Sequence, residues 1–158
     1  MSGQEEAESC ARAMCNSEPW ITLRRQYEHA LHGITNPTRE VLVALVENVL
    51  SGFIIVNMAG PFQGYIQVLC VFPECRHRGV GSALIGFAEK RIFRETPNVF
   101  LCVSSFNTTA QRFYEQLGYK RIGEIEDYVI EGHSEFLMRK TLGPLADYPA
   151  PAQRKSKK

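Results

Sequence analysis

The sequence lacks the features that would assign it to a membrane or secreted class. No apolar run approaches the roughly 18 residues that cross a bilayer. The N-terminus carries Glu5, Glu6 and Glu8 where a secretory signal would have an apolar segment. The five cysteines form no CxxC pair, and their odd number argues against a disulfide framework. We therefore expect a soluble, cytoplasmic protein with reduced cysteines and no contact with a membrane.

The sequence also lacks the paired ligand spacing of a metal site. Cys70, Cys75 and His77 lie close together along the chain, but no CxxC or HxxxH pair accompanies them. Structural zinc sites are typically built from such pairs. Buried apolar cysteines are the simpler interpretation, and we expect no metal.

Neither sign of charge is in excess over the whole chain, which has a formal net charge of +1. The imbalance is local, because residues 150–158 contain four cations and no acid. A nucleic-acid-binding module that uses this tail is the weakest functional hypothesis, since the tail has no aromatic residue on which a base could stack. We expect no nucleic-acid partner.

What the chain does contain is the composition of one globular domain, with 44% hydrophobic residues in a length of 158. Apolar residues at helical spacing predict helices over residues 4–16, from about 20 to 31, 80–93 and 108–117. β-Branched runs predict strands over residues 40–46, 50–58, 64–71, 99–104, 119–127 and 133–142. This order predicts a single α/β or α+β domain over residues 1–143 with a hairpin-rich sheet. Residues 144–158 are expected to form a basic, disordered tail.

The loop Arg76–Ser82 lies between a predicted strand and a predicted helix and contains two arginines and two glycines. Glycines let the backbone approach a ligand, and the unpaired N–H groups of a helix N-terminus attract anions. A turn with solvated arginines is the alternative. The loop is not a dinucleotide fingerprint, because Leu84 stands where the third glycine would be, and no Walker A sequence occurs.

A second motif begins 26 residues after Gly81 and opens the last predicted helix. Together with the loop and the strand before it, this motif resembles the GNAT superfamily of N-acetyltransferases. The resemblance covers roughly residues 52–140. The residues that carry it are Leu69-Cys70-Val71-x-Pro73, Arg76-x-x-Gly79-x-Gly81 and Asn107-x-x-Ala110-x-x-Phe113-Tyr114.

The resemblance implies a mixed, mostly antiparallel sheet of six to seven strands, flanked by helices and splayed at its central strands. It implies acetyl-CoA as co-substrate, with the pyrophosphate on backbone N–H groups of the glycine loop and the pantetheine arm between the splayed strands. The N–H of Val71 would face the thioester carbonyl. The implied cofactor residues are Leu69, Val71, Arg76, His77, Arg78, Gly79, Val80, Gly81, Ser82, Asn107 and Phe113.

Tyr114 is the candidate catalytic residue by the same resemblance. The matching tyrosine of the family protonates the departing thiolate of coenzyme A. A phenol of pKa about 10 can do this for a thiol near 8.5 only where the site is arranged for it. The alternative role is packing, since Tyr114 continues an apolar stripe with Ala110, Phe113 and Leu117.

The resemblance does not identify a general base in this chain. Many family members carry a glutamate on the strand matching residues 64–71 or on the next strand, and this chain has no acid in either. Glu124, Glu126 and Asp127 are expected to be solvated surface charges. A site without a base favours a weakly basic acceptor such as an α-amine, or proton removal through water.

Residues 1–36 are expected to be helical and to wall the acceptor site, with Trp20, Arg24, Arg25 and Tyr27 as its side chains. The two arginines would hold a carboxylate or form a solvated face. The predicted function is transfer of an acetyl group to a primary amine of a small amino-acid-like molecule or a protein N-terminus. A non-catalytic acyl-CoA sensor on the same fold is the alternative, and a homodimer is left open.

Overall fold

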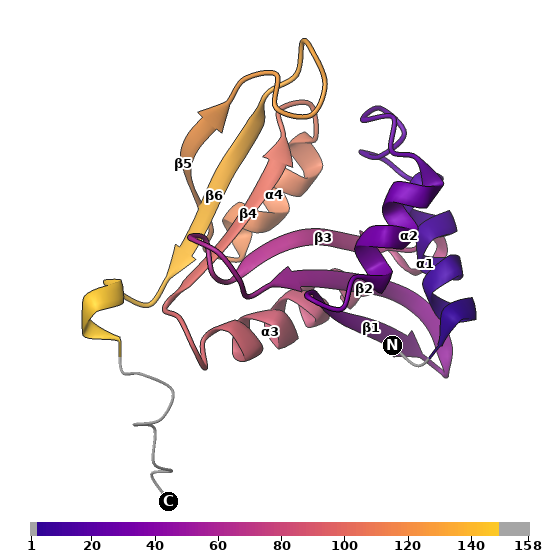
Figure 1. Cartoon of the computed structure of the whole chain (residues 1–158), viewed down its shortest axis with the longest axis horizontal. Helices are drawn as coiled ribbons and strands as arrows, with labels where there is room; N and C mark the ends of the chain where they lie inside the picture. Colours follow the sequence, from indigo (N-terminus) through magenta and orange to yellow (C-terminus); the bar gives the residue numbers. More distant parts are fainter. Residues whose placement is uncertain (1–2, 149–158) are drawn as a thin grey trace, which may run out of the picture.

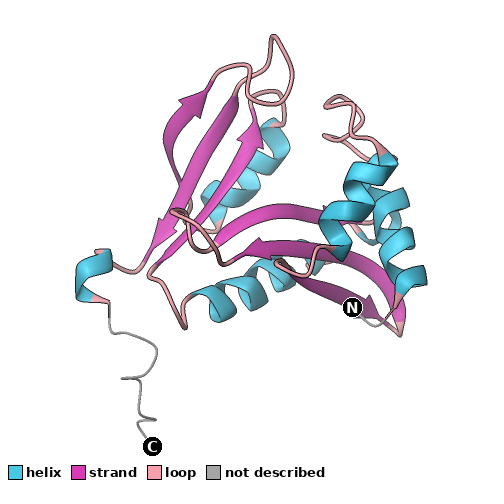
Figure 2. Ribbon diagram, in the orientation of Figure 1, coloured by secondary structure: helices cyan, strands magenta, loops and turns pink. Residues whose placement is uncertain are grey.

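The computed structural model describes residues 3–148, which form one open six-stranded sheet with helices on both faces (Figures 1 and 2). The helices are α1 (Gln4–Cys15), α2 (Tyr27–Thr35), α3 (Val80–Ile92) and α4 (Thr108–Gln116), with two short 3₁₀ turns, η1 (Pro73–Cys75) and η2 (Leu145–Asp147). The strands are β1 (Glu40–Val46), β2 (Val49–Asn57), β3 (Tyr65–Val71), β4 (Asn98–Ser104), β5 (Lys120–Ile125) and β6 (Glu135–Thr141).

The strand order is β1-β2-β3-β4-β6-β5, and every neighbouring pair is antiparallel except β3 and β4. These two central strands pair at only two positions, Tyr65 with Phe100 and Ile66 with Leu101. Beyond Ile66 they diverge, so that β1–β3 and β4–β6 form two wings of a V in Figure 1. The predicted mixed sheet with splayed central strands is confirmed.

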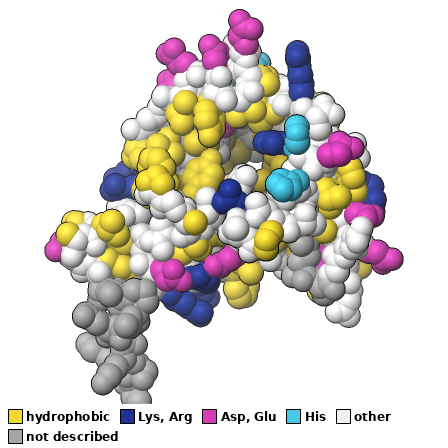
Figure 3. All heavy atoms as spheres, in the orientation of Figure 1, with side chains coloured by type: hydrophobic (Ala, Val, Ile, Leu, Met, Phe, Trp, Pro, Cys, Tyr) yellow, Lys and Arg dark blue, Asp and Glu magenta, His cyan; other side chains and the backbone are white. Residues whose placement is uncertain are grey.

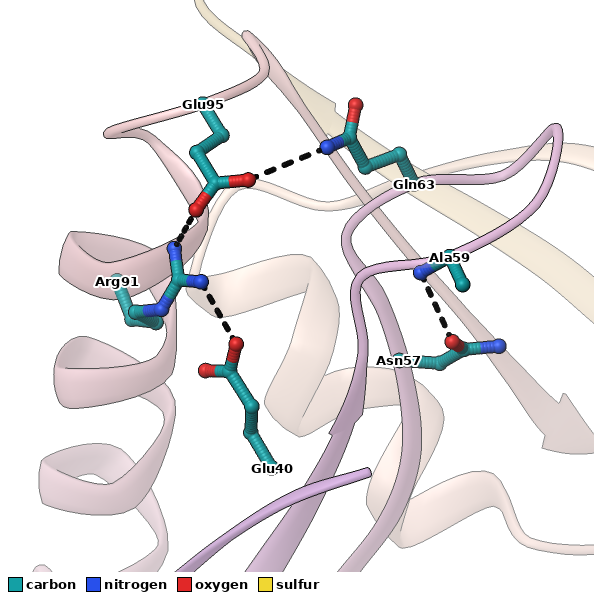
Figure 4. A network of polar contacts seen from close by, with 6 residues as sticks. All are labelled: Glu40, Asn57, Ala59, Gln63, Arg91 and Glu95. Atoms are coloured by element: carbon teal, nitrogen blue, oxygen red, sulfur yellow. Dashed lines mark hydrogen bonds and ion pairs between the residues drawn. The ribbon is translucent and has the colours of Figure 1, made fainter. Parts of the chain in front are cut away.

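Local sequence explains the first hairpin and the loop that follows it. Glu47 and Asn48 both have positive φ angles, of 52° and 63°, as a two-residue hairpin turn requires. At the end of β2, the Asn57 side-chain oxygen accepts the Ala59 N–H at 3.0 Å (Figure 4), and its main-chain oxygen accepts the Gly64 N–H at 3.1 Å. The chain is thereby returned to the start of β3.

Each face of the sheet has its own apolar core. Helices α3 and α4 cover one face, where Leu84, Ile85 and Tyr114 pack with Leu101 and Val103 of β4. Helices α1 and α2 cover β2 and β3 on the other face, where their buried residues pack against the buried side chains of those strands. These residues are Ala7, Cys10, Ala11, Met14, Ala30 and Ile34 of the helices and Phe53, Ile55, Val68 and Cys70 of the strands. Because the α1–α2 pair packs on the β1–β3 wing, the same face of β4–β6 is left open beside it (Figure 1).

The second predicted helix begins later than its apolar spacing indicated. The expectation of a helix from about Trp20 is wrong, since residues 17–24 form turns and α2 begins at Tyr27. Arg24 has a φ of 52°, in the left-handed region that a right-handed helix excludes. Residues 3–36 are therefore two helices joined by a turned loop.

The predicted tail also begins later than expected. Residues 144–148 are ordered, and the Tyr148 hydroxyl donates to the main-chain oxygen of Phe93 just past α3. That contact fastens the segment to the domain, which sequence composition alone did not indicate. The remaining tail residues, 149–158, lie outside the described part. Between residues 3 and 148, no helix is long and apolar enough to cross a membrane.

An ion-pair network joins α3 to the edge of the sheet. Arg91 of α3 lies with Nη2 at 2.6 Å from Glu40 Oε1 of β1 and Nη1 at 2.6 Å from Glu95 Oε1. Gln63 then donates to the other Glu95 oxygen at 3.4 Å, which extends the network to the loop before β3 (Figure 4). The network therefore ties α3 to β1 and to that loop.

Replacing Arg91 with methionine should lower the free energy of unfolding by about 1 kcal/mol, because two solvent-screened ion pairs are lost while the apolar stem is kept. Urea denaturation at low salt is the measurement, and about 1 M NaCl should erase most of the difference. Arg94→Met is the control, since the described residues give Arg94 no ion-pair partner. Equal losses in both variants would show that the network contributes nothing.

Candidate functional site

A cleft of about 1130 Å³ occupies the space where β3 and β4 diverge. Figure 3 shows a hollow in this face of the molecule, with hydrophobic side chains along its wall. The loop of residues 17–24 contributes Trp20 and Leu23 to the lining, and the loop between β5 and β6 contributes Tyr128 and Val129. Two loops far apart in sequence therefore contribute to one opening.

The predicted anion loop lies along this cleft, at the N-terminus of α3. Gly79 is the N-cap with φ of 81°, and no side chain caps the helix. The first intrahelical bond runs from the Ala83 N–H to the Gly79 oxygen at 3.0 Å. The N–H groups of Val80, Gly81 and Ser82 therefore have no acceptor within the helix and are available to an anion.

Arg76 and Arg78, the two arginines of the loop, have different positions. Arg76 lines the cleft and donates from Nε to the main-chain oxygen of Val71 at 3.2 Å, which fastens the loop to the end of β3. His77 also lines the cleft and has a positive φ of 59°. Arg78 is exposed and is not among the described residues that form the lining.

The loop, the end of β3 and α4 meet at Gly81. A Cβ atom at this position would lie 3.4 Å from the Phe113 ring and 3.5 Å from the Val71 side chain. A larger side chain would therefore intrude between three elements that line the cleft. A single Cβ would make ordinary contacts at these distances, so the approach excludes only side chains larger than a methyl group.

Asn107 caps α4, as its sequence position predicts. Its Oδ1 accepts the Ala110 N–H at 3.2 Å. This bond occupies the side-chain oxygen of Asn107. Its side-chain N–H groups have no hydrogen-bond acceptor among residues 3–148. Asn107 also lines the cleft, so its N–H groups are available to a ligand there.

Tyr114 lies on α4 with 8% of its surface exposed, and it too lines the cleft. Its ring packs against Phe113 and Tyr119, with centroid distances of 5.3 Å and 5.8 Å. Burial raises the pKa of the Tyr114 hydroxyl above its ordinary value of 10.0. The hydroxyl therefore keeps its proton at neutral pH and has it available to donate.

The opposite side of the cleft carries polar groups from three strands. Tyr65 of β3 lies beside Cys102 of β4, and Ser104 of β4 donates to Glu135 of β6 at 2.5 Å. All four residues line the cleft. Glu135 is only 5% exposed, and burial raises the pKa of its carboxyl group. The cleft therefore holds a buried carboxylate.

A family model identifies the family to which this chain belongs. The family model described as the Acetyltransferase (GNAT) family matches residues 5–119. The chain belongs to this family. A relative from Methanocaldococcus jannaschii, described as an uncharacterized N-acetyltransferase, is 32% identical over 100 residues, which are 62% of this chain and 64% of that protein. A longer relative from Mycobacterium leprae is matched over only 22% of its length.

Solved GNAT structures share the fold at low identity. An aminoglycoside 6'-N-acetyltransferase complexed with coenzyme A superposes with a TM-score of 0.68 at 18% identity, over 87% of this chain and 91% of that one. The ribosomal-protein-S18-alanine N-acetyltransferase from Escherichia coli superposes with a TM-score of 0.69 at 15% identity, over 89% and 88%. The predicted family and its sheet are thus confirmed.

Eleven of the twelve site residues that the GNAT motifs predict lie together along the cleft, and Arg78 is the exception. The predicted acceptor wall is only partly present. Trp20 and Arg25 line the cleft, whereas Arg24 and Tyr27 do not. The turns of residues 17–24 take the place of the single helix that would have carried all four side chains. Within residues 3–148, no three His, Cys, Asp or Glu side chains are grouped to hold a metal ion.

The cleft also contains side chains that the GNAT motifs did not predict, among them Arg39, Tyr128, Ser104 and Glu135. Glu135 was missed because it lies outside both strands in which an acid was sought. In the sequence, Glu135 is visible only as an acid near the start of the last predicted strand. Its place in the cleft follows from the pairing of β6 with β4, which sets Glu135 opposite Ser104.

Proposed function

We propose that this protein transfers the acetyl group of acetyl-CoA to a primary amine by direct attack of the amine on the thioester. The observation that carries the proposal is the meeting of three features in one cleft. These are the uncapped N-terminus of α3, the unpaired ends of β3 and β4, and the hydroxyl-bearing ring of Tyr114.

The donor side of the cleft has the chemistry that acetyl-CoA requires. Backbone N–H groups of Val80, Gly81 and Ser82 bind the pyrophosphate, with Arg76 beside them. A central strand directs alternate N–H groups toward its two neighbours, and β3 has no β4 partner beyond Ile66. The pantetheine arm occupies that gap as a third strand would, between β3 and Asn107.

Chemistry takes place in the gap between β3 and β4. The N–H of Val71 stabilises the oxyanion that forms when the amine adds to the thioester carbonyl. Tyr114 then donates its phenolic proton to the departing sulfur as the carbon–sulfur bond breaks. The acceptor is a small amino-acid-like amine or a protein N-terminus. A small-molecule amine and a protein amine both occur in the names of proteins with similar folds, as an aminoglycoside and a ribosomal-protein alanine.

An acceptor screen tests this function. Purified protein with acetyl-CoA should release free thiol in the presence of at least one of three amines, namely kanamycin, spermidine and an alanyl tetrapeptide. Mass spectrometry should find one added acetyl group on that amine. Binding of coenzyme A without acceptor-dependent thiol release across the panel would instead support the acyl-CoA sensor.

A further inference from the structure

Glu135 is an unusual residue for the wall of an open cleft. It is the first residue of β6, is only 5% exposed, and accepts the Ser104 hydroxyl proton through Oε1. Its second oxygen, Oε2, has no hydrogen-bond donor and no cation within 4 Å among residues 3–148. Burying a carboxylate without a cationic partner is costly, so such a group is generally retained for a ligand or a reaction.

The pleat of the sheet places Glu135 on the opposite face from Tyr114. Tyr114 packs with Leu101 of β4 and Met138 of β6, which pair with each other. Ser104 and Glu135 form another pair on these strands, each three positions from the first pair. Because successive side chains alternate between faces, an odd separation places them on the other side.

That other face is the one left open beside α1 and α2. A thioester held between β3 and β4 would therefore have Tyr114 on one side and Glu135 on the other. An amine that enters along the loop carrying Trp20 would reach the thioester from the side of Glu135, since Trp20 packs against the α1–α2 core on that face of the sheet. This arrangement places a proton acceptor and a proton donor on opposite sides of the reacting carbon.

We infer that Glu135, held by Ser104, is the general base that binds and deprotonates the acceptor ammonium. The assignment rests on the proposed acetyltransfer. The ammonium R–NH₃⁺ gives one proton to Glu135, and the nitrogen lone pair then forms the bond to the acetyl carbon. The carbon–sulfur bond breaks, Tyr114 protonates the thiolate, and the second nitrogen proton replaces the one that Tyr114 lost. The Glu135 proton leaves to solvent through the cleft.

The groups that face Glu135 leave it free to titrate alone. Tyr65 of β3 and Cys102 of β4 are its titratable neighbours, and desolvation raises the pKa of both, so both remain neutral at neutral pH. Tyr128, from the loop between β5 and β6, also raises the pKa of Tyr65 electrostatically. On β5, the residue that pairs with Glu135 is the apolar Ile125. Burial raises the pKa of Glu135 itself, which makes the carboxylate a better proton acceptor than a solvated one.

A carboxylate in this position changes the expected acceptor class. Without a base, the sequence favoured weakly basic amines that are partly neutral at about pH 7. With Glu135 in the acceptor half, an amine that is fully protonated at neutral pH can bind as a cation and be deprotonated in place. We therefore expect cationic alkyl amines to be acceptors as well as α-amines.

The test compares wild type with Glu135→Gln, using whichever of kanamycin, spermidine and alanyl tetrapeptide gives the highest turnover. At about pH 7 the variant should lose about 10²-fold in kcat/KM for the amine, the usual contribution of a general base. The deficit should shrink to less than about 10-fold near pH 9.5, where free amine is abundant. The affinity for coenzyme A should stay unchanged, because Glu135 lies away from the α3 N-terminus.

Ser104→Ala is the second variant. The Ser104 hydrogen bond lowers the pKa of Glu135, so its removal should shift the acidic limb of the kcat/KM profile to higher pH. The plateau activity should remain. A purely structural Glu135 would give no such shift.

Glu124→Gln is the matched control, because Glu124 is an exposed carboxylate on the adjacent strand β5 and does not line the cleft. Its turnover should equal that of wild type. A Glu135→Gln deficit that is equal at all pH values, or no deficit, would overturn the base assignment and leave the proposed function standing. Absence of acceptor-dependent turnover in wild type would overturn both.

Discussion

Replacing Tyr114 with phenylalanine should lower kcat for acetyl transfer by about 10²-fold, because the leaving sulfur would lose its proton donor. Phenylalanine keeps the ring that packs between Phe113 and Tyr119. The KM for acetyl-CoA should therefore change by less than about 2-fold, which places the loss in the chemical step. Steady-state kinetics with a fixed, saturating amine would measure both constants.

Tyr119→Phe is the control for the loss of a buried hydroxyl, since Tyr119 is 2% exposed and is not part of the cleft lining. Its kcat should remain at the wild-type value. Burial raises the pKa of Tyr114, so wild-type activity should show no decline from phenol ionisation below about pH 10. An unchanged kcat in Tyr114→Phe would refute its role as the general acid and leave it a packing residue.

Replacing Gly64 with alanine should have the largest effect on stability, because a Cβ atom there meets backbone. It would lie 2.5 Å from the main-chain oxygen of Asn98 and 2.6 Å from an Ile92 methyl group, at a φ of 88°. Left-handed strain and overpacking together predict a loss of about 3 kcal/mol in the free energy of unfolding. Urea denaturation would measure it.

Gly64 also lies where the central strands join, since its oxygen accepts the Phe100 N–H at 3.0 Å beside the two β3–β4 pairs. Gly60→Ala separates the two causes of the loss, because Gly60 has a similar φ of 83° and a Cβ atom added there would meet no atom within 4 Å. It should lose only about 1 kcal/mol, from strain alone. Equal losses at both positions would show that the close approach to Asn98 is unimportant.

Sequence alone predicted most of the secondary structure and the donor half of the site. The alternating β-branched runs and helical spacings identified all six strands and three of the four helices with good boundaries, because each pattern is local. The loop Arg76–Ser82 and the cap Asn107 were equally predictable, since N-caps and glycine turns depend on backbone geometry within a few residues. The family's motifs lie in these segments.

The failures concern contacts that sequence spacing does not encode. The apolar spacing around Trp20 and Leu23 suggested a helix, but in the structure these residues face the cleft from turns that precede α2. Tyr148 has no local pattern either, and only its hydrogen bond to Phe93 shows that the chain is fastened there.

What the sequence by itself determined is a GNAT domain with a loop suited to the pyrophosphate of coenzyme A. The acceptor half was decided by tertiary structure, because β6 pairs with β4 across a separation of 31 residues between Ser104 and Glu135. That pairing buries a carboxylate on the face opposite Tyr114, and no local signal specifies either the burial or the face.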